Sequence, residues 1–261
     1  MPELYGIEGQ CLSYEFATPW GNSSVRGNEL PEEHKDLYSL NSEGFRCDEF
    51  VPKDHKLSLL FSGCSNTFGQ GTKNIQDTWS HKLYTAISKD EETSGYFNIG
   101  TPGANFPLIV SNIMKYCNRF GNPDIIFILF PPIERFYAFK DDSYRLGVYG
   151  AEDEEMVRVI KAINFQMYLC LDQYCRSNNI KLFSSAWDLS KDYSIFNCSE
   201  TFDIGDINSV TKKLMEIVLK HSERKDLLEV EDGHYGFAYQ ELWFERFYDR
   251  YLRDLDVNIR D

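Results

Sequence analysis

The stretch that decides the fold is LSLLFSGCSNTFGQGTKNIQDTWSHKLYTAI, which runs from Leu57 to Ile87. Its first part, 57–63, is a mostly apolar run with the length of a buried strand. A loop with several glycines follows, and apolar residues then recur at helical spacing from Trp79 onward. A strand, a loop and a helix in this order form a repeating unit of α/β domains. Ser65 follows the strand directly, at the edge where parallel sheets bind ligands.

The rest of the chain continues this alternation of strands and helices. The predicted strands are 57–63, 96–100, 124–130 and 180–187, and the predicted helices are 78–88, 106–117, 153–176, 208–221 and 237–253. This order favours right-handed crossovers and a parallel sheet with helices on both faces. We therefore expect an α/β fold, a three-layer α/β/α sandwich with a flavodoxin-like parallel sheet.

The longest predicted helix, 153–176, carries an apolar stripe. Its acidic start, 153–155, suits the positive end of a helix dipole. Apolar side chains spaced by three and four residues lie on one face of a helix, so we expect them to be buried. The predicted buried residues are Met156, Ile160, Ile163, Met167, Cys170 and Tyr174.

The chain divides into an irregular start and a regular remainder. Residues 1–55 are rich in Gly, Pro, Asn, Ser and Glu, with aromatic residues interspersed. Free linkers rarely carry so many aromatics, so we predict an N-terminal extension over 1–55 that packs on a domain spanning 56–261. The stretch 131–150 follows the central strand and is too long for a tight turn. We interpret it as a wall or lid of the site.

The charge of the chain restricts its partners. The 261 residues carry a formal charge of -14, while 42% hydrophobic residues provide ample material for a core. A negative field of this size repels phosphate backbones and anionic lipid surfaces. We therefore expect neither nucleic acid nor membrane as a partner.

The cysteines suggest a reducing compartment. There are seven of them, in scattered positions and with no CxxC pair. This pattern favours reduced, mostly buried thiols over disulfides or a zinc site, and we predict no metal and no cofactor. The N-terminus, MPELYGIEGQCLSYEF, lacks the basic region and apolar run of a signal peptide. Together with the lack of any run long enough to cross a bilayer, this predicts synthesis in the cytoplasm.

The loop around Ser65 fits none of three well-known glycine-loop motifs. A phosphate-binding P-loop requires Gly-x4-Gly-Lys-Ser/Thr, which the segment 69–74 does not provide. A dinucleotide-binding fingerprint requires a third glycine where Asn74 stands. The GxSxG elbow of α/β hydrolases requires a glycine at Thr67.

A fourth pattern fits better, because four blocks occur in the order of one family. The blocks are Asn41-Ser42-Glu43-Gly44-Phe45-Arg46, Gly63-x-Ser65-x-Thr67-x-Gly69, Asn98-Ile99-Gly100-Thr101-Pro102-Gly103-Ala104 and Glu231-Asp232-Gly233-His234. The set resembles the SGNH (GDSL-like) hydrolases, whose first block is written GDSxTxG. The resemblance covers residues 41–234.

The resemblance implies a catalytic mechanism. Ser65 would attack an ester carbonyl, and His234 would take its proton and later protonate the leaving alcohol. The backbone N–H groups of Ser65 and Gly103 would form the oxyanion hole, where each donor is typically worth about 3 kcal/mol. The family spacing places the acid that orients His234 at Glu231, whereas the usual residue type stands at Asp232; we retain both. Candidate substrate-binding residues are Asn66, Asn105 and Arg135.

The chain also departs from the family pattern. Cys64 replaces the aspartate before the serine. The asparagine of the third block, which supplies an oxyanion donor in the family, is absent from the segment 130–135, and proline has no N–H to replace it. Arg135 is a candidate substitute donor.

These observations lead to two functions of different classes. The first is a serine esterase of the SGNH type that acts on a small-molecule or carbohydrate ester, with an O-acetylated carbohydrate as the example. The alternative is a catalytically weak or inactive SGNH-like domain that binds a glycan or serves as part of a virion or other assembly. The GCSxTxG block resembles SGNH-type proteins of phages and their hosts, and such an origin would allow oligomers or association with a virion. An acyltransferase with the same serine and histidine is a third hypothesis.

Overall fold

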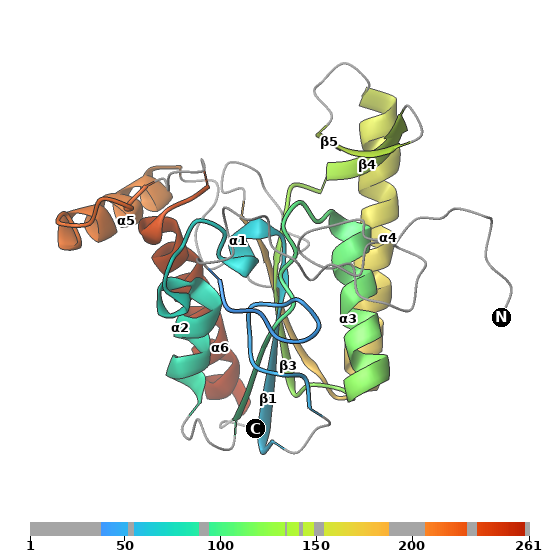
Figure 1. Ribbon diagram of the computed structural model, residues 1–261, viewed down its shortest axis with the longest axis horizontal. Coiled ribbons are helices and arrows are strands. Elements are labelled where there is room, and N and C mark those ends of the chain that lie inside the picture. The colour runs from blue at the N-terminus through green and yellow to red at the C-terminus, as the bar shows by residue number, and fades with distance from the viewer. Residues whose placement is uncertain are drawn as a thin grey trace, which may run out of the picture.

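The computed structural model describes residues 38–51, 55–88, 94–133, 135–140, 143–148, 154–187, 207–228 and 234–258. Figure 1 shows a twisted sheet between two layers of helices. The elements are β1 (Leu57–Gly63), α1 (Ser65–Phe68), the 3-10 turn η3 (Ile75–Asp77), α2 (Trp79–Ile87), β2 (Ser94–Asn98), α3 (Phe106–Phe120), β3 (Ile125–Phe130), β4 (Arg135–Lys140), β5 (Ser143–Val148), α4 (Glu154–Ser177), β6 (Lys181–Ala186), α5 (Ile207–Lys220) and α6 (Phe237–Asn258).

The main sheet has four parallel strands in the order β2-β1-β3-β6. Because the chain moves from β1 outward to β2 and then back across β1 to β3, its crossover helices cover opposite faces. Figure 1 shows α2 and α6 on one face and α3 and α4 on the other. The predicted three-layer α/β/α fold with a flavodoxin-like strand order is confirmed.

The strands are apolar on both sides because helices cover both faces. Every residue of β3 is buried. Toward α2 and α6, Phe127 stacks between Phe61 of β1 and Phe183 of β6, with ring centroids 5.4 and 5.0 Å apart. Toward α3, Phe130 stacks on Phe106 at 4.0 Å. Each buried aromatic side chain of this kind contributes about 1.5–3 kcal/mol to folding.

The described part of the N-terminal segment, 38–51, packs on the sheet and its helices. Phe45 is fully buried, and it lies with Phe50 in the core cluster on the α3 face. Tyr38 forms a separate small cluster with Phe68 of α1. The boundary at residue 55 stays a prediction, and residues 1–37 lie outside the described residues.

The predicted buried face of α4 is wrong. Met156 and Ile163 are 43% and 53% exposed, and Cys170 is also exposed. Ile160, Met167 and Tyr174 are only partly buried. The buried residues of α4 are Asn164, Tyr168, Leu171 and Cys175.

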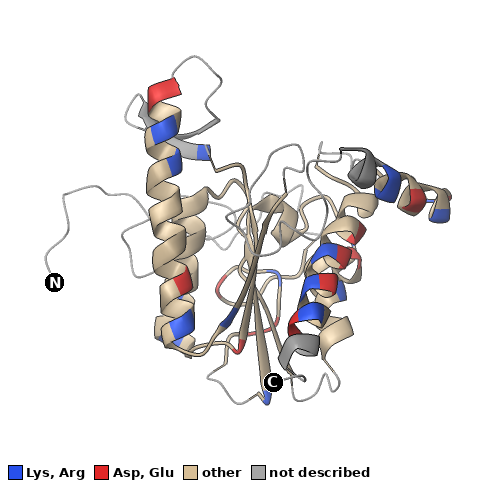
Figure 2. Ribbon diagram, turned by 180° about the vertical axis from the view of Figure 1, so that it is seen from behind, with Lys and Arg blue, Asp and Glu red and all other residues tan. Residues whose placement is uncertain are grey.

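Two polar contacts accompany this orientation of α4. The Tyr168 hydroxyl bonds Ser184 Oγ at 2.8 Å, and Asn164 Nδ2 donates to the carbonyl of Ile133 at 2.6 Å. A stripe count treats Asn164 as an outward-facing polar residue, so it selects a face about a quarter turn away. Figure 2 shows that charged residues gather toward the two ends of α4, whose central part carries none.

The stretch after β3 contains a second, two-stranded sheet. β4 and β5 pair in antiparallel fashion, from Arg135 opposite Val148 to Lys140 opposite Ser143. Figure 1 shows this hairpin beyond the carboxyl end of β3, beside the N-terminal end of α4. Its role as a wall or lid stays a prediction. Within the described ranges, no helix combines the length and apolar character needed to cross a bilayer.

Candidate active site

The candidate nucleophile lies on a tight loop at the carboxyl end of β1. Ser65 is the first residue of the short helix α1, and its side chain and those of the next three residues are buried. Gly63 is required before it, because a Cβ at this position would collide with the side chain of Thr67 and the backbone of Leu129. Cys64, the helix N-cap, is buried as well.

Three side chains from distant segments hold the carbonyls of this nucleophile loop, which we define as residues 63–73. The donors come from α6, from the end of β2 and from the N-terminal segment. The pairs are Gln240 Nε2 to Asn66 O (3.4 Å), Asn98 Nδ2 to Thr67 O (2.8 Å) and Arg46 Nη1 to Gly69 O (2.8 Å). The loop backbone is therefore fixed from three directions by hydrogen bonds to buried side chains.

The loop after β2 is docked directly on the nucleophile loop. Asn98 Oδ1 accepts from the N–H of Gly100 at 2.9 Å while its Nδ2 holds Thr67. Thr101 N–H donates to Gly63 O at 3.0 Å. Gly100 has no space for a side chain, because a Cβ would collide with the backbone of α1. The first and second sequence blocks thus form one unit at the carboxyl edge.

The second block turns through Gly103 into helix α3. Gly103 has a positive φ of 75°, and Ala104 N–H donates to Thr101 O at 3.0 Å to close the turn. Asn105, a predicted substrate-binding residue, caps α3, and its Oδ1 accepts from Leu108 N–H at 3.1 Å. Asn66, another predicted substrate contact, has a buried side chain.

Arg135 is the first residue of β4 and follows β3 by a short connection, in the part of the chain where the family pattern has its third block. Its Nη1 is 3.5 Å from the carbonyl of Ala104, the neighbour of Gly103. Its guanidinium also lies 5.8 Å from the ring centre of Trp187, which follows β6. Its Nε is buried and has no hydrogen-bond partner among the described residues. Arg135 therefore lies between the second block and the end of β6.

His234 precedes α6 and is half-buried. The two candidate acids, Glu231 and Asp232, lie outside the described residues. Backbone bonds close the base of this second loop, the histidine loop (residues 229–236). They run from Gly236 N to Leu228 O (2.9 Å), from Phe237 N to Asp226 O (2.8 Å) and from Ala238 N to Leu227 O (2.8 Å). These carbonyls satisfy N–H groups at the start of α6 that have no partner within the helix.

The start of α6, which follows His234, is bonded to the nucleophile loop. Gln240 bonds Asn66 O through its Nε2, and its Oε1 accepts from Trp79 N–H at 2.9 Å. Tyr235, next to His234, packs on Trp187 with ring centroids 5.6 Å apart. Among the described contacts there is no hydrogen bond between the side chains of Ser65 and His234. Such catalytic bonds often form only when substrate binds.

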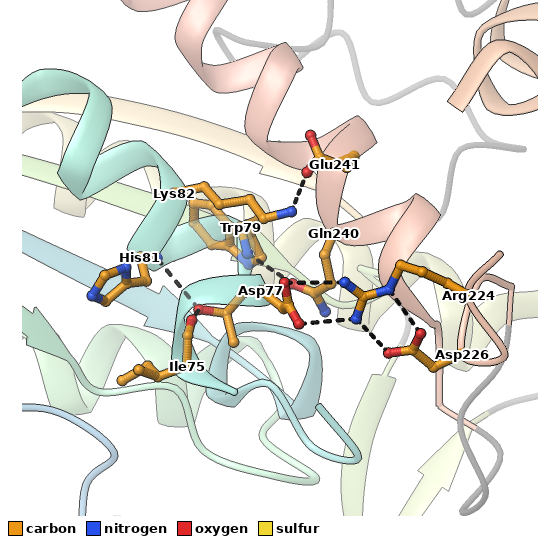
Figure 3. A network of polar contacts seen from close by, with 10 residues as sticks. Ile75, Asp77, Trp79, His81, Lys82, Arg224, Asp226, Gln240 and Glu241 are labelled. Atoms are coloured by element: carbon orange, nitrogen blue, oxygen red, sulfur yellow. Dashed lines mark hydrogen bonds and ion pairs between the residues drawn. The ribbon is translucent and has the colours of Figure 1, made fainter. Parts of the chain in front are cut away.

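An ion-pair network joins η3 to the chain just before the histidine loop, as Figure 3 shows. Arg224 bonds the carboxylate of Asp77 at 2.9 Å and that of Asp226 at 2.8 Å. Its guanidinium lies 4.0 Å from the ring centre of Phe237, at the first position of α6. The hydrogen bonds from Arg224 lower the pKa of Asp226 and raise the pKa of Arg224 itself. The network connects the start of α2 to the chain that leads into the histidine loop.

Sequence reasoning missed the residues that hold the two loops. Arg46 and Asn98 lie within the family-like sequence blocks. Their place in these blocks was a signal that each has a role. Gln240 and Arg224 lie in ordinary helical or turn sequence and carry no such signal. Their roles depend on partners far away in the chain.

Comparisons with known proteins give structural similarities only. No family model and no curated protein matches the sequence. A presumed acylhydrolase from Bacteroides fragilis matches at 13% identity and a TM-score of 0.38, over 78% of this chain and 90% of that one. A two-domain esterase active on acetylated mannans matches at 13% and 0.41, over 76% and 50%. A protein of the lipolytic G-D-S-L family from Veillonella parvula matches at 11% and 0.32, over 73% and 95%.

The molecule's own sheet supports the family resemblance at the level of fold. Its parallel strands follow the order β2-β1-β3-β6, and Ser65 and Gly103 follow β1 and β2 at one edge. The start of α6, directly after His234, is bonded to that same edge through Gln240. The chain thus has the α/β fold that its SGNH-like blocks predicted.

Proposed function

We propose that this protein is a serine ester hydrolase of the SGNH type that acts on a small acyl ester. The observation that carries the proposal is the joining of three segments at one sheet edge. The Ser65 loop, the Gly103 loop and the start of α6 after His234 are connected through Asn98 and Gln240. A nucleophile, an oxyanion donor and a base must meet in this way for acyl transfer.

The proposed reaction uses an acyl-enzyme. Ser65 Oγ attacks the ester carbonyl carbon while His234 accepts the hydroxyl proton. The N–H groups of Ser65 and Gly103 stabilise the negative oxygen of the tetrahedral intermediate. His234 then gives the proton to the leaving alcohol, and water hydrolyses the acyl-serine by the same steps. Asp232 or Glu231 holds the imidazole in the required tautomer.

Arg135 is the proposed third contact to the reacting ester. It follows β3, as the missing asparagine does in the family, and its guanidinium lies beside the Ala104 carbonyl. An arginine donor forms charge-assisted hydrogen bonds, which are roughly twice as strong as neutral ones. Donation from Arg135 to the substrate would compensate for the lost asparagine.

The proposed substrate class is an acyl ester on a carbohydrate. An O-acetyl group on a carbohydrate follows from the family resemblance. Trp187 is half-buried beside Arg135, and the half-buried Tyr235 packs on Trp187, so the two provide aromatic surface at this edge. An acceptor alcohol in place of water would give the acyltransferase, which product analysis with added sugars distinguishes from the hydrolase.

The test is covalent labelling with a fluorophosphonate probe, followed by mass spectrometry to locate the adduct. The expected result is an adduct on Ser65 that disappears in Ser65→Ala and in His234→Ala. Ser42→Ala removes an exposed hydroxyl outside the loop and serves as the matched control, which we expect to be labelled normally. A folded wild-type protein that takes no label would overturn the hydrolase proposal.

The second candidate is an inactive SGNH-like domain with a glycan-binding or virion-assembly role. One specific observation favours it: β3 is followed by Pro131 and Pro132, and neither offers an N–H to an oxyanion. The labelling experiment separates the two candidates, because an inactive domain would not activate Ser65.

A further inference from the structure

We propose that Arg46 and Tyr38 are positioning residues that fix the catalytic geometry of Ser65 by holding the end of the nucleophile loop. This inference rests on the proposed function. It assigns a positioning role to two residues of the N-terminal segment, Tyr38 and Arg46, and explains why the Asn41–Arg46 block ends in an arginine.

Arg46 is 3% exposed and spans the loop that follows the nucleophile. Its Nη1 donates to Gly69 O at 2.8 Å, and its Nη2 donates to Lys73 O at 2.9 Å. Gly69 N–H in turn donates to the carbonyl of Ser65 at 2.9 Å. Two hydrogen bonds through one glycine therefore connect the guanidinium to the backbone of the nucleophile.

Gly69 is suited to this connection. It adopts the left-handed conformation at the end of α1, with φ of 78°, which favours glycine. A Cβ at this position would collide with the Thr78 side chain and lie 3.2 Å from Arg46 Nη1. Glycine at position 69 therefore lets the Arg46 guanidinium approach the loop backbone closely.

Tyr38 holds the middle of the same loop. Its hydroxyl accepts from Gly71 N–H at 2.7 Å, and its ring centre lies 4.6 Å from the Arg46 guanidinium carbon. Its ring also meets Phe68 of α1 edge-on at 5.1 Å. Tyr38 thus contacts the cation, the loop backbone and the helix that begins with Ser65.

A compact turn anchors Arg46 to the domain. Asn41 Oδ1 accepts from Phe45 N–H at 2.9 Å, and Asn41 N–H donates to Phe45 O at 2.8 Å. Phe45 is fully buried. Because the residue before Arg46 is fixed in the core, the guanidinium has a rigid base from which to bind the loop.

The choice of arginine needs an explanation beyond packing. Burial lowers the pKa of Arg46, which records the desolvation of its charged form. Replacing buried ion pairs with apolar residues is often neutral for stability, so stability alone does not explain a buried arginine. The planar fork of a guanidinium can bind two carbonyls in fixed directions, whereas a lysine ammonium cannot reproduce that geometry. Fixed directions matter here because a misplacement of about 1 Å in a catalytic group can slow the reaction about 100-fold.

The experiment compares four variants of the full chain. Arg46→Met removes both donors and keeps an apolar stem, Arg46→Lys keeps the charge, and Tyr38→Phe removes only the hydroxyl. The matched control is Glu43→Gln, in the same block, whose carboxylate forms an exposed pair with Arg119 at 2.7 Å. The readouts are the rate of fluorophosphonate labelling at Ser65, kcat and KM for a chromogenic acetyl ester, and the melting temperature.

We expect Arg46→Met to lower kcat and the labelling rate by about 10- to 100-fold, with KM changed less than about threefold. Arg46→Lys should fall between it and the wild type, Tyr38→Phe should lose a smaller factor, and Glu43→Gln should match the wild type. Methylguanidine added to Arg46→Met should recover part of the labelling rate, which a purely structural defect would not allow.

Distinct outcomes separate this inference from the proposed function. If the wild type takes no label, the hydrolase proposal fails and the positioning role fails with it. If the wild type is labelled and folded Arg46→Met is labelled at the same rate, only the positioning role is overturned. Should Arg46→Met not fold, Arg46→Lys and Tyr38→Phe decide: wild-type kcat and labelling rates in both would overturn the inference.

Discussion

The nucleophile loop and the described chain on either side of the histidine loop are held by different kinds of contact. Buried side-chain donors from Arg46, Asn98 and Gln240 bind the carbonyls of the nucleophile loop. The histidine loop is closed by backbone bonds and supported by Arg224, whose carboxylate partners are partly exposed. One loop thus depends on buried hydrogen bonds and the other on partly solvated ion pairs.

This difference predicts how each loop responds to loss of a hydrogen-bond partner and to salt concentration. Removing one partner of a buried hydrogen bond leaves the other unsatisfied, at a cost of about 1–3 kcal/mol for each group. Exposed ion pairs contribute typically 0–1 kcal/mol and are screened by salt. We therefore expect the contacts of the nucleophile loop to be rigid and insensitive to salt. The contacts beside the histidine loop should weaken as the salt concentration rises.

The largest effect should come from Asn98→Leu, which removes hydrogen bonds that hold the nucleophile loop. The change leaves Thr67 O and Gly100 N–H without their buried partner. We expect a loss of about 2–4 kcal/mol of unfolding free energy in urea melts and a loss of most labelling at Ser65. Asn118→Leu is the control, since that side chain is exposed on α3 and the change should alter stability little. Equal effects of the two variants would contradict the comparison.

Gln240→Met should have the next largest effect, because Gln240 contacts both the nucleophile loop and the start of α2. Trp79 N–H would lose its 2.9 Å acceptor, and Asn66 O would lose its donor. We expect a loss of about 1–3 kcal/mol in stability. The pH profile of ester hydrolysis should also change, because the base would be less firmly placed relative to Ser65. An unchanged rate and profile would show that α6 does not couple the loops.

Arg224→Gln should have a smaller effect that depends on salt. It removes the bridge between Asp77 and Asp226, and we expect a loss of at most about 1 kcal/mol in dilute buffer. The difference from the wild type should shrink at about 1 M salt, where the Debye length is about 3 Å. The effect of Asn98→Leu should persist at the same salt. Arg176→Gln, which removes the exposed pair with Asp172 on α4, is the control for a general charge effect.

The smallest effect should be a pH dependence of the ion-pair network. Arg224 lowers the pKa of Asp226 in the folded protein, so the pair stabilises the fold above the ordinary aspartate pKa of about 3.9. This contribution is lost as the pH falls through the lowered pKa. The melting temperatures of wild type and Asp226→Asn should differ by a constant amount above about pH 5 and converge in stronger acid. A difference that grows in acid would contradict the predicted sign.

Two helices on the same face of the sheet show how far periodicity can predict burial. In α3, apolar residues at helical spacing such as Ile109 and Ile113 are buried, as periodicity predicts. In α4 the stripe is rotated, because Asn164 and Tyr168 bind polar partners inside while Ile163 stays exposed. A stripe count treats polar residues as outward-facing, so it fails where buried polar groups find partners.

The candidate site was predicted where local sequence carries the chemistry. The block around Ser65 and the turn at Gly103 follow strands that composition alone identifies. By contrast, Gln240 reaches Asn66 across 174 positions of the chain, and no spacing rule anticipates that contact. The sequence also left the acid partner of His234 open between Glu231 and Asp232, which lie outside the described residues.

The sequence by itself determined the alternation of strands and helices, the parallel sheet and the place of Ser65 after β1. These follow from hydrophobic periodicity and from the glycine-containing turns after the strands, which can be read locally in the sequence. Only the tertiary structure decided which face of α4 is buried and which side chains hold the two loops. Hydrogen bonds such as Arg46 to Gly69 depend on direction and on desolvation after the chain has folded, and residue order does not encode them locally.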